Sequence, residues 1–296
     1  MPFLGELSAL FTACLWSGSA LVFTAATRRV GSFQVNISRL ILGALYLLLT
    51  VAVFGLDTRL SPTQFLNLAI SGLVGLTIGD TFLFKAFQEI GARVSMLIMS
   101  LAPAFAAMLA YVILGEGLTL LALAGMGITL SGIAIVVLER SPGRTDLTHL
   151  TAPGVLYALI GAIGQGAGLV FAKMAFREAE LDSFVATTVR ILASLVPLLP
   201  LAIITGRYGN PIRAFAADPA AFRLTVLGSL LGPFLGISFS LVATKYTDVG
   251  VAATIMAIVP ILMLPLVRII YREHLTPRAV AGAFVAVAGV AVLFLR

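Results

Sequence analysis

The amino-acid sequence predicts an all-α integral membrane protein of ten transmembrane helices, arranged as two inverted five-helix repeats. Three observations predict this fold class: an apolar composition, ten apolar runs of membrane-spanning length, and an internal repeat that divides those runs into two groups of five. Of the 296 residues, 60% are hydrophobic and only 11% are charged, whereas a soluble domain carries about 25% charged residues. So few charges cannot cover a water-facing surface, and we therefore expect lipid to cover most of the chain.

Each apolar run is bounded by charged residues or by residues that favour turns, and spanning a bilayer takes roughly 20 residues. The first two connections contain Arg28-Arg29 and Asp57-Thr58-Arg59, and the longest polar stretch, 139–151, falls at the middle of the chain. In order, the predicted spans are 4–25, 33–54, 65–87, 94–113, 120–138, 153–175, 183–205, 222–244, 250–270 and 278–295.

The two halves of the chain share a sequence pattern. Shifting the chain by 157 residues aligns 73–138 with 230–295 without a gap, and a slightly smaller shift matches Arg39 with Arg190. Chance similarity between apolar runs would not place glycines, prolines and a glutamate in register. The aligned pairs include Gly75 with Gly232, Gly79 with Gly236, Pro103 with Pro260, Glu116 with Glu273, Gly125 with Gly282, and Gly132 with Gly289. The repeat predicts two domains, 1–140 and 152–296, each holding five helices.

Because each repeat holds an odd number of spans, the second repeat must begin on the opposite side of the membrane from the first. Both termini then lie on the same side. Inverted repeats of this kind recur among secondary transporters, where the substrate site lies near the midplane between the halves. This step is an architectural analogy, and it predicts a central cavity and an alternating-access mechanism.

Glycines and prolines occupy corresponding places in the two repeats. The G-x-x-x-G pair Gly75 and Gly79, and its counterpart around Gly232, would let a neighbouring helix approach closely. Pro103 and Pro260 lie near the middle of the fourth and ninth spans, where proline frees the carbonyl four residues back. We interpret these prolines as hinges that line the cavity; a packing kink is the alternative.

Asp80 is the strongest functional candidate, because an acid inside a membrane span costs roughly 2.5–3.5 kcal/mol and is by default a functional-site hypothesis. Its counterpart in the second repeat is Ile237, so the charge breaks the symmetry. The second and third spans place Arg39 and Asp80 at comparable depth. The pair therefore predicts either a fixed structural contact or a proton-coupling site, and the sequence leaves both open.

The other predicted substrate-binding side chains give a mostly apolar cavity with scattered hydrogen-bonding groups. They are Trp16, Ser19, Asn36, Phe84, Met99, Gln165 and Ser238. The sequence does not predict an enzyme, because the predicted spans hold neither a base beside a nucleophile nor a second acid beside Asp80. The single cysteine, Cys14, and the two loop histidines, His149 and His274, give no metal cluster, and no cofactor is expected.

The formal charge of +6 comes mainly from arginines that flank the apolar runs, which indicates topology determinants and no nucleic-acid partner. Most of them fall in loops on the side opposite the N-terminus. The positive-inside rule then places both termini outside the cell. Because one chain already contains both halves, we expect a monomer that binds a small-molecule substrate within the lipid bilayer.

Several motifs resemble the EamA family of the drug/metabolite transporter superfamily: Leu15-Trp16-Ser17-Gly18-Ser19, Ser38-Arg39-Leu40, and the duplicated Glu-x-Leu-Thr with its following glycines. The resemblance covers nearly the whole chain. It implies a ten-helix exporter of small metabolites such as amino acids, in a cell membrane such as the bacterial inner membrane, with termini in the cytoplasm. That orientation disagrees with the charge count, which we favour because it is read from this chain. A flippase for a lipid or lipid-linked sugar is the alternative function.

Overall fold

The computed structural model describes residues 3–90, 95–96, 98–138, 151–271 and 276–295. Glu273, His149 and His274 lie outside these residues. Within the described ranges every regular element is a helix. The helices are α1 (Leu4–Val30), α2 (Ser32–Phe54), α3 (Pro62–Gly72), η1 (Leu73–Gly79), α4 (Asp80–Glu89), α6 (Ala102–Leu114), α7 (Leu120–Leu138), α8 (Ala152–Glu178), α9 (Ser183–Ile204), α10 (Pro211–Ala217), α11 (Pro219–Ser229), η2 (Leu230–Gly236), α12 (Ile237–Tyr246), α13 (Val249–Met256), α14 (Val259–Tyr271) and α15 (Pro277–Phe294).

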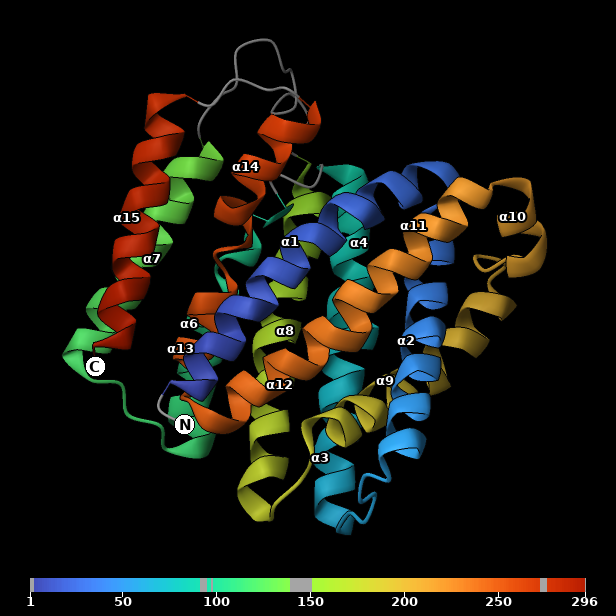
Figure 1. Cartoon of the computed structure of the whole chain (residues 1–296), viewed down its shortest axis with the longest axis horizontal. Helices are drawn as coiled ribbons and strands as arrows, with labels where there is room; N and C mark the ends of the chain where they lie inside the picture. The colour runs from blue at the N-terminus through green and yellow to red at the C-terminus, as the bar shows by residue number, and fades with distance from the viewer. Residues whose placement is uncertain (1–2, 91–94, 97, 139–150, 272–275, 296) are drawn as a thin grey trace.

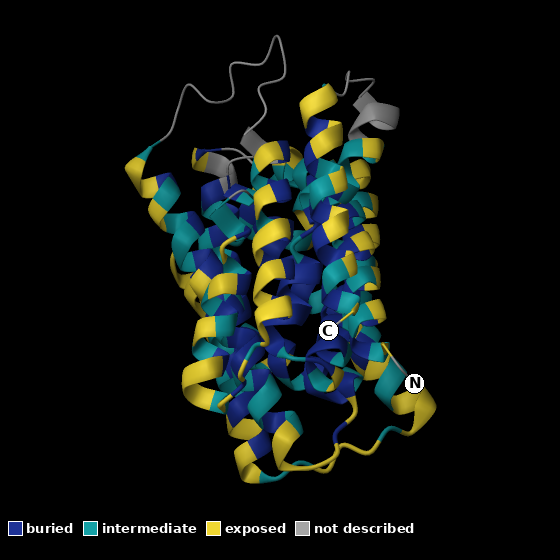
Figure 2. Cartoon of the chain, turned by 90° about the vertical axis from the view of Figure 1, so that its left-hand side faces the viewer, coloured by how far each residue is buried: buried dark blue, intermediate teal, exposed yellow. Residues whose placement is uncertain are grey.

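Eight continuous helical segments are long and apolar enough to cross a membrane, and two shorter apolar segments, Ala102–Leu114 and Leu120–Val136, accompany them. Their outer faces carry large exposed hydrophobic side chains, such as Phe54, Val112 and Ile204. Figure 2 shows these exposed positions along the outside of the bundle, with buried positions toward its centre. An apolar outer surface of this kind is suited to lipid and would be unfavourable in water.

The third span of each half contains a π-helical segment at the corresponding place. In the first half, η1 joins α3 to α4, and in the second half η2 joins α11 to α12. The two segments begin at Leu73 and Leu230 and end at Gly79 and Gly236, so the repeat alignment superimposes them. π-Helical turns are rare and occur often at functional sites. The sequence pattern predicted these glycines but not the π geometry.

The fourth and ninth predicted spans, 94–113 and 250–270, are each interrupted by a turn just before their prolines. Turns at 100–101 and 257–258 precede α6 and α14, so Pro103 and Pro260 each stand second in a new helix. A proline in the first turn sacrifices no helical hydrogen bond, because that N–H has no partner within the helix. The prolines therefore mark helix starts, and the kink within a continuous span that the sequence suggested is not what the structure shows.

The helices of the two halves pack against one another. The first helix of each half contacts the third span of the other: α1 packs on α11, η2 and α12, and α8 packs on α3, η1 and α4. In the same manner α2 contacts α9, and α7 contacts α15. Figure 1 shows α7 and α15 side by side at one edge of the bundle, away from α2 and α9. The space between the crossing helices is where a central site would form.

The predicted close approach at the glycine pairs is confirmed, with a difference between the halves. On η1, a Cβ added at Gly79, the counterpart of Gly236, would lie 3.5 Å from the backbone N of Gln165 on α8, so two backbones meet there. On η2, a Cβ at Gly236 would lie 2.5 Å from Nε1 of Trp16 on α1. The first contact joins backbones because α8 is glycine-rich. In the second contact, the ring of Trp16 on α1 packs against Gly236 of η2, where a larger residue would leave no room for it.

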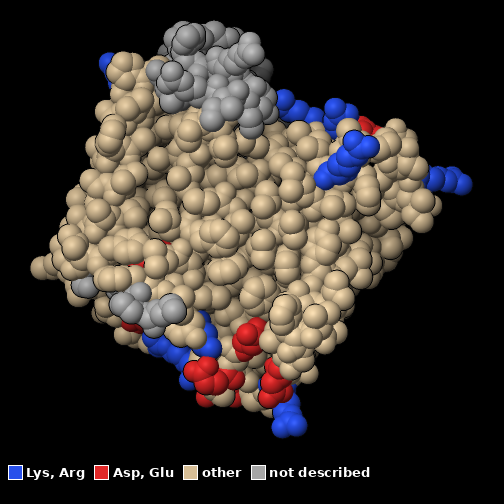
Figure 3. Space-filling model, viewed as in Figure 1, with Lys and Arg blue, Asp and Glu red and all other residues tan. Residues whose placement is uncertain are grey.

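The two ends of the bundle differ in charge. The N- and C-terminal marks both lie toward the lower end in Figures 1 and 2. Figure 3 shows the acidic side chains of the visible face gathered at that end, whereas its upper right carries mainly basic side chains. Arg28 and Arg29, at the far end of α1, belong to the basic end. This distribution agrees with the arginine asymmetry in the sequence.

Candidate functional site

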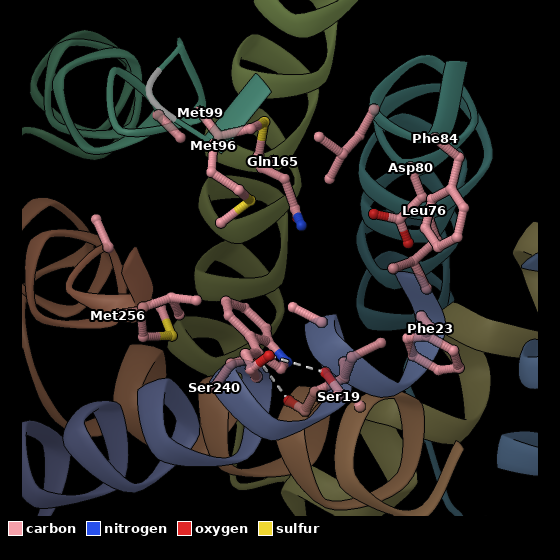
Figure 4. A pocket seen from close by; sticks show the side chains of 18 of the residues that line it. Ser19, Phe23, Leu76, Asp80, Phe84, Met96, Met99, Gln165, Ser240 and Met256 are labelled. Carbon is pink, nitrogen blue, oxygen red and sulfur yellow. Dashed lines mark hydrogen bonds between the residues drawn. The ribbon is translucent and has the colours of Figure 1, made fainter. Parts of the chain in front are cut away.

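A cavity of about 620 Å³ lies between the two halves of the bundle. It is lined by residues of α1, α2, η1, α4, α8, α9, η2, α12 and α13, and by residues around the helix breaks before Pro103 and Pro260. Of the predicted site residues, seven side chains and one hinge line it: Trp16, Ser19, Arg39, Asp80, Phe84, Met99, Gln165 and Pro103. Figure 4 shows Ser19, Asp80, Phe84, Met99 and Gln165 around this space.

The cavity follows α1 for several turns. Its lining on that helix runs from Trp16, past Ser19 and Phe23, to Arg28 at the helix end. Ser32 at the start of α2 also lines it. Because Arg28 is exposed, the cavity reaches the end of the bundle that lies opposite the termini.

Arg39 and Asp80 form a buried ion pair on the cavity wall. Nη2 of Arg39 donates to Oδ2 of Asp80, and the two residues are only 7% and 5% exposed. Nε of Arg39 donates to Oδ1 of Asn36 at 2.9 Å. The guanidinium also lies 5.4 Å from the ring centre of Phe23 and 4.8 Å from that of Phe84, within cation–π range. The sequence predicted the pair but could not predict the two aromatic rings that flank it.

Arg190, the repeat counterpart of Arg39, also lines the cavity. It is 2% exposed, and its Nε and Nη1 have no hydrogen-bond partner among the described residues. Asp80 is near enough to attract its charge. The duplicated arginine was the signal for this site, but only the structure places it in the cavity.

The remaining wall is largely apolar. Met96, Met99 and Met256 lie on one side of the cavity, and Leu76 lies on the other beside Asp80 (Figure 4). Gln165 of α8 extends its side-chain amide into the space between them (Figure 4). Methionine side chains are flexible and adapt to ligands of different shape. Such a wall suits an organic solute with an apolar part.

Three predicted residues do not line the cavity. Asn36 contributes indirectly, by holding the guanidinium of Arg39. Ser238 donates to the carbonyl of Phe234 within its own helix at 2.6 Å, and Ser240, two positions on, lines the cavity instead. Pro260 is adjacent to Val259, which does line it. Two positions correspond to roughly 200° around a helix, so the choice between Ser238 and Ser240 depends on helix rotation.

The end of the bundle near the termini is held by a polar network between the halves. Glu116 accepts from Nη2 of Arg177 at 2.8 Å and from the backbone N–H of Val249 at 2.9 Å. Within the second half, Lys173 donates to the carbonyls of Thr244 and Thr247, at 2.7 and 3.0 Å. Glu116 thus joins the two halves at a loop.

Within the described ranges no three His, Cys, Asp or Glu side chains come together to hold a metal ion. The polar groups of the cavity are instead guanidinium, carboxylate, amide and hydroxyl groups, which bind solutes by hydrogen bonds and charge.

A bundle of apolar helices around a largely apolar cavity with buried charges is the architecture of a membrane transporter. The chain belongs to the EamA-like transporter family, which matches residues 3–138 and 152–295. It is therefore a multi-pass membrane protein, and its family is one of transporters.

Two relatives match almost the whole chain. An uncharacterized transporter of Archaeoglobus fulgidus is 25% identical over 98% of this chain and 97% of its own. A probable terminal-alkyne amino-acid exporter of Streptantibioticus cattleyicolor is 24% identical over 95% of this chain and 90% of its own. A solved crystal structure resembles the chain with a TM-score of 0.80, covering 99% of this chain and 96% of that one at 19% identity. That likeness concerns the fold alone.

Proposed function

We propose that this protein is a secondary transporter that exports small metabolites such as amino acids by alternating access. In this proposal ten helices cross the membrane as two inverted five-helix repeats, residues 1–140 and 152–296, within one monomer. The two family matches, the paired π-helical segments and the paired helix breaks support the repeat. An exporter for amino acids among the relatives supports the substrate class.

The observation that carries the proposal is the cavity between the halves. Its volume of about 620 Å³ is in the range of small-molecule sites. It reaches the end of the bundle at Arg28, while Glu116 and Arg177 link the halves at the other end. A cavity that reaches one end while polar contacts join the halves at the other is what one state of an alternating-access cycle requires.

We propose further that Asp80 and Arg39 couple transport to a proton gradient. Desolvation favours the neutral acid, whereas the neighbouring guanidinium favours the carboxylate. A rearrangement that separates α2 from α4 would remove the second effect, and Asp80 would then take up a proton. Closing the pair again would release it.

A flippase is less well supported by this geometry. A carrier of lipids needs polar groups that are accessible from the side of the bundle. Here Ser19, Arg39, Asp80 and Ser240 are all buried around the cavity, an arrangement that favours a solute enclosed by protein.

The proposed function is tested with purified protein in vesicles. Uptake and efflux of a panel of amino acids and other metabolites are measured with and without a pH gradient. We expect protein-dependent movement of at least one amino acid and acceleration by the gradient. Movement of a labelled phospholipid between leaflets, without movement of any solute on the panel, would contradict the proposal and support a flippase.

A further inference from the structure

Arg190 presents a buried positive charge with two nitrogen atoms that have no hydrogen-bond partner among the described residues. Its Nε and Nη1 have no acceptor in the described part of the chain, and the residue is only 2% exposed. A buried charge without a partner costs several kcal/mol. Ionisable groups inside membrane proteins mark substrate and ion pathways, so a buried guanidinium of this kind at a cavity wall points to a ligand as its partner.

The surrounding backbone makes room for this guanidinium. A Cβ at Gly75 would lie 3.3 Å from Nη2 of Arg190, and a Cβ at Gly72 would collide with the carbonyl of Arg190. Both glycines precede Asp80 in the third span, within α3 and η1. The close packing of these segments on α9 fixes the position of the arginine, so the side chain is held in place before any ligand arrives.

The charges of the cavity wall leave Arg190 uncompensated. The described charged residues that line the cavity are Arg28, Arg39, Asp80 and Arg190. Asp80 attracts Arg190 through space, but its carboxylate is hydrogen-bonded to Arg39. Arg28 is exposed at the far end of α1. One further negative charge would therefore neutralise the buried part of the site.

The internal repeat shows where that charge is missing. Arg39 of α2 corresponds to Arg190 of α9, and Asp80 of α4 corresponds to Ile237 of α12. Ile237 is buried and lines the same cavity. The first half therefore has an arginine with its carboxylate, whereas the second half has the arginine with an isoleucine at the carboxylate position.

We propose that Arg190 binds the carboxylate of the transported solute, which takes in the second half the part that Asp80 plays in the first. The proposal rests on the proposed transport function and narrows its substrates to small carboxylates, such as amino acids, with an apolar remainder. Guanidinium and carboxylate groups match in a bidentate geometry. The apolar remainder would lie toward Met96, Met99 and Met256, across the cavity.

The test supplies the missing carboxylate from the protein. Ile237→Asp places an acid at the position that corresponds to Asp80, and Ile237→Asn is the matched uncharged control. Binding of L-amino acids and of their C-terminal amides is measured by thermal shift on the purified protein in detergent. The amides keep the side chain and the amino group but lack the carboxylate.

In the wild type and in Ile237→Asn, we expect the free acid to bind more tightly than its amide by about tenfold or more, because hydrogen bonds to charged groups contribute this much. In Ile237→Asp this preference should disappear, and the Tm without ligand should rise. Arg190→Gln should also abolish the preference, whereas Arg213→Gln, at an exposed position of α10 that is not among the residues lining the cavity, should preserve it.

Equal binding of acid and amide by the wild type, or an undiminished preference in Ile237→Asp, would overturn the assignment. A loss of preference in Arg213→Gln would also overturn it, by indicating a general effect of positive charge. Transport of amides, amines or uncharged solutes in vesicles, without binding of any carboxylate, would refute carboxylate binding by Arg190 and leave the transport function intact. If the vesicles move no solute at all, the proposed function fails as well.

Discussion

The buried contact between Arg39 and Asp80 can be either a permanent structural ion pair or an ion pair that opens when Asp80 takes up a proton. Arg39 keeps three other neighbours when Asp80 is changed: Asn36 and the rings of Phe23 and Phe84. Those contacts lessen the cost of removing the carboxylate charge. The ion pair can therefore open during transport, because Arg39 keeps other contacts when Asp80 is released.

For Asp80→Asn we expect protein that folds and exchanges substrate passively but no longer responds to a proton gradient. Counterflow and gradient-driven uptake in vesicles measure the two activities separately. Asp57→Asn, which changes a carboxyl in an exposed loop, is the matched control. A loss of about 3–5 kcal/mol in the free energy of unfolding, the typical cost of breaking a buried ion pair, would instead indicate a permanent structural ion pair. Retained gradient-driven transport would also exclude the coupling role.

Asp218 provides a pH-dependent contact outside the membrane-spanning helices. Its Oδ1 accepts the backbone N–H of Ala221 at 3.0 Å, and Oδ2 accepts from Nη1 of Arg29 at 3.1 Å. The hydrogen bond from Ala221, followed by the one from Arg29, lowers the pKa of the Asp218 carboxyl below its ordinary value. The contact thus connects the end of α1 to the start of α11.

Because the pKa of Asp218 is lowered in the folded state, its stabilising contribution is complete above the ordinary pKa of an aspartate. We expect it to be lost as pH falls from that value through the lower, folded pKa. Melting temperatures of the wild type and Asp218→Asn, measured between neutral and acidic pH, test this. Asparagine can cap the helix without titrating, so the variant should depend less on acidic pH. Identical pH profiles would contradict the prediction.

At the scale of single elements, the breaks before α6 and α14 make Pro103 and Pro260 candidates for hinges. Alanine would restore a backbone N–H four residues after Met99 and Met256, so each broken region could join into one stiffer helix. We expect the Pro103→Ala, Pro260→Ala double variant to transport much more slowly while keeping its folded yield. Pro265→Ala, within α14 and away from its break, should transport normally. Unchanged turnover in the double variant would leave the prolines with a packing role only.

The contact between α7 and α15 depends on small residues. A Cβ at Gly132 would collide with the backbone N of Ala286 and lie 2.6 Å from the carbonyl of Gly282. Gly127, on the same helix, has nothing within 4 Å of an added Cβ. The two glycines therefore offer a matched pair of substitutions within one element.

We expect Gly132→Ala to lower the free energy of unfolding by about 1–3 kcal/mol, the usual cost of overpacking. Gly127→Ala should be neutral or stabilising by about 0.5–1 kcal/mol, because alanine favours the helix more than glycine does. Thermal unfolding of the two variants in detergent compares them directly. Equal effects would show that α7 and α15 do not pack as closely as described.

At the scale of the whole molecule, the position of the termini follows from the number of spans. If each repeat crosses the membrane five times, cysteines introduced near both ends react with an impermeant reagent from the same side. Labelling from opposite sides would refute the ten-span arrangement. The natural Cys14 lies within α1 and is first replaced by alanine, so that it does not contribute to the signal.

The absolute orientation of the molecule requires a second measurement. The basic end of the bundle lies opposite the termini, so the positive-inside rule places the termini outside. A fluorescent protein fused to the C-terminus should then remain dark, since it folds poorly after export. Bright cytoplasmic fluorescence would show that the orientation implied by the family resemblance is the correct one.

The sequence by itself predicted the apolar spans, the internal repeat, and the comparable depth of Arg39 and Asp80 in their spans. These features depend on the length and hydrophobicity that a bilayer demands and on residues that recur in register. Thr119 and Thr276 were likewise predictable as helix caps, and each accepts a backbone N–H three residues on. Such signals are local, so no knowledge of the packing is needed to find them.

Only the tertiary structure decided which side chains face the cavity. Ser240 rather than Ser238 lines it, Phe23 and Phe84 flank Arg39, and Arg190 and Ile237 both lie at its wall. Two of the Arg190 nitrogens have no partner among the described residues. Each of these depends on the rotation of a helix about its axis, which changes by about 100° per residue. In a chain whose outer faces are as apolar as its core, hydrophobic periodicity does not set that rotation, so packing between helices of opposite halves does.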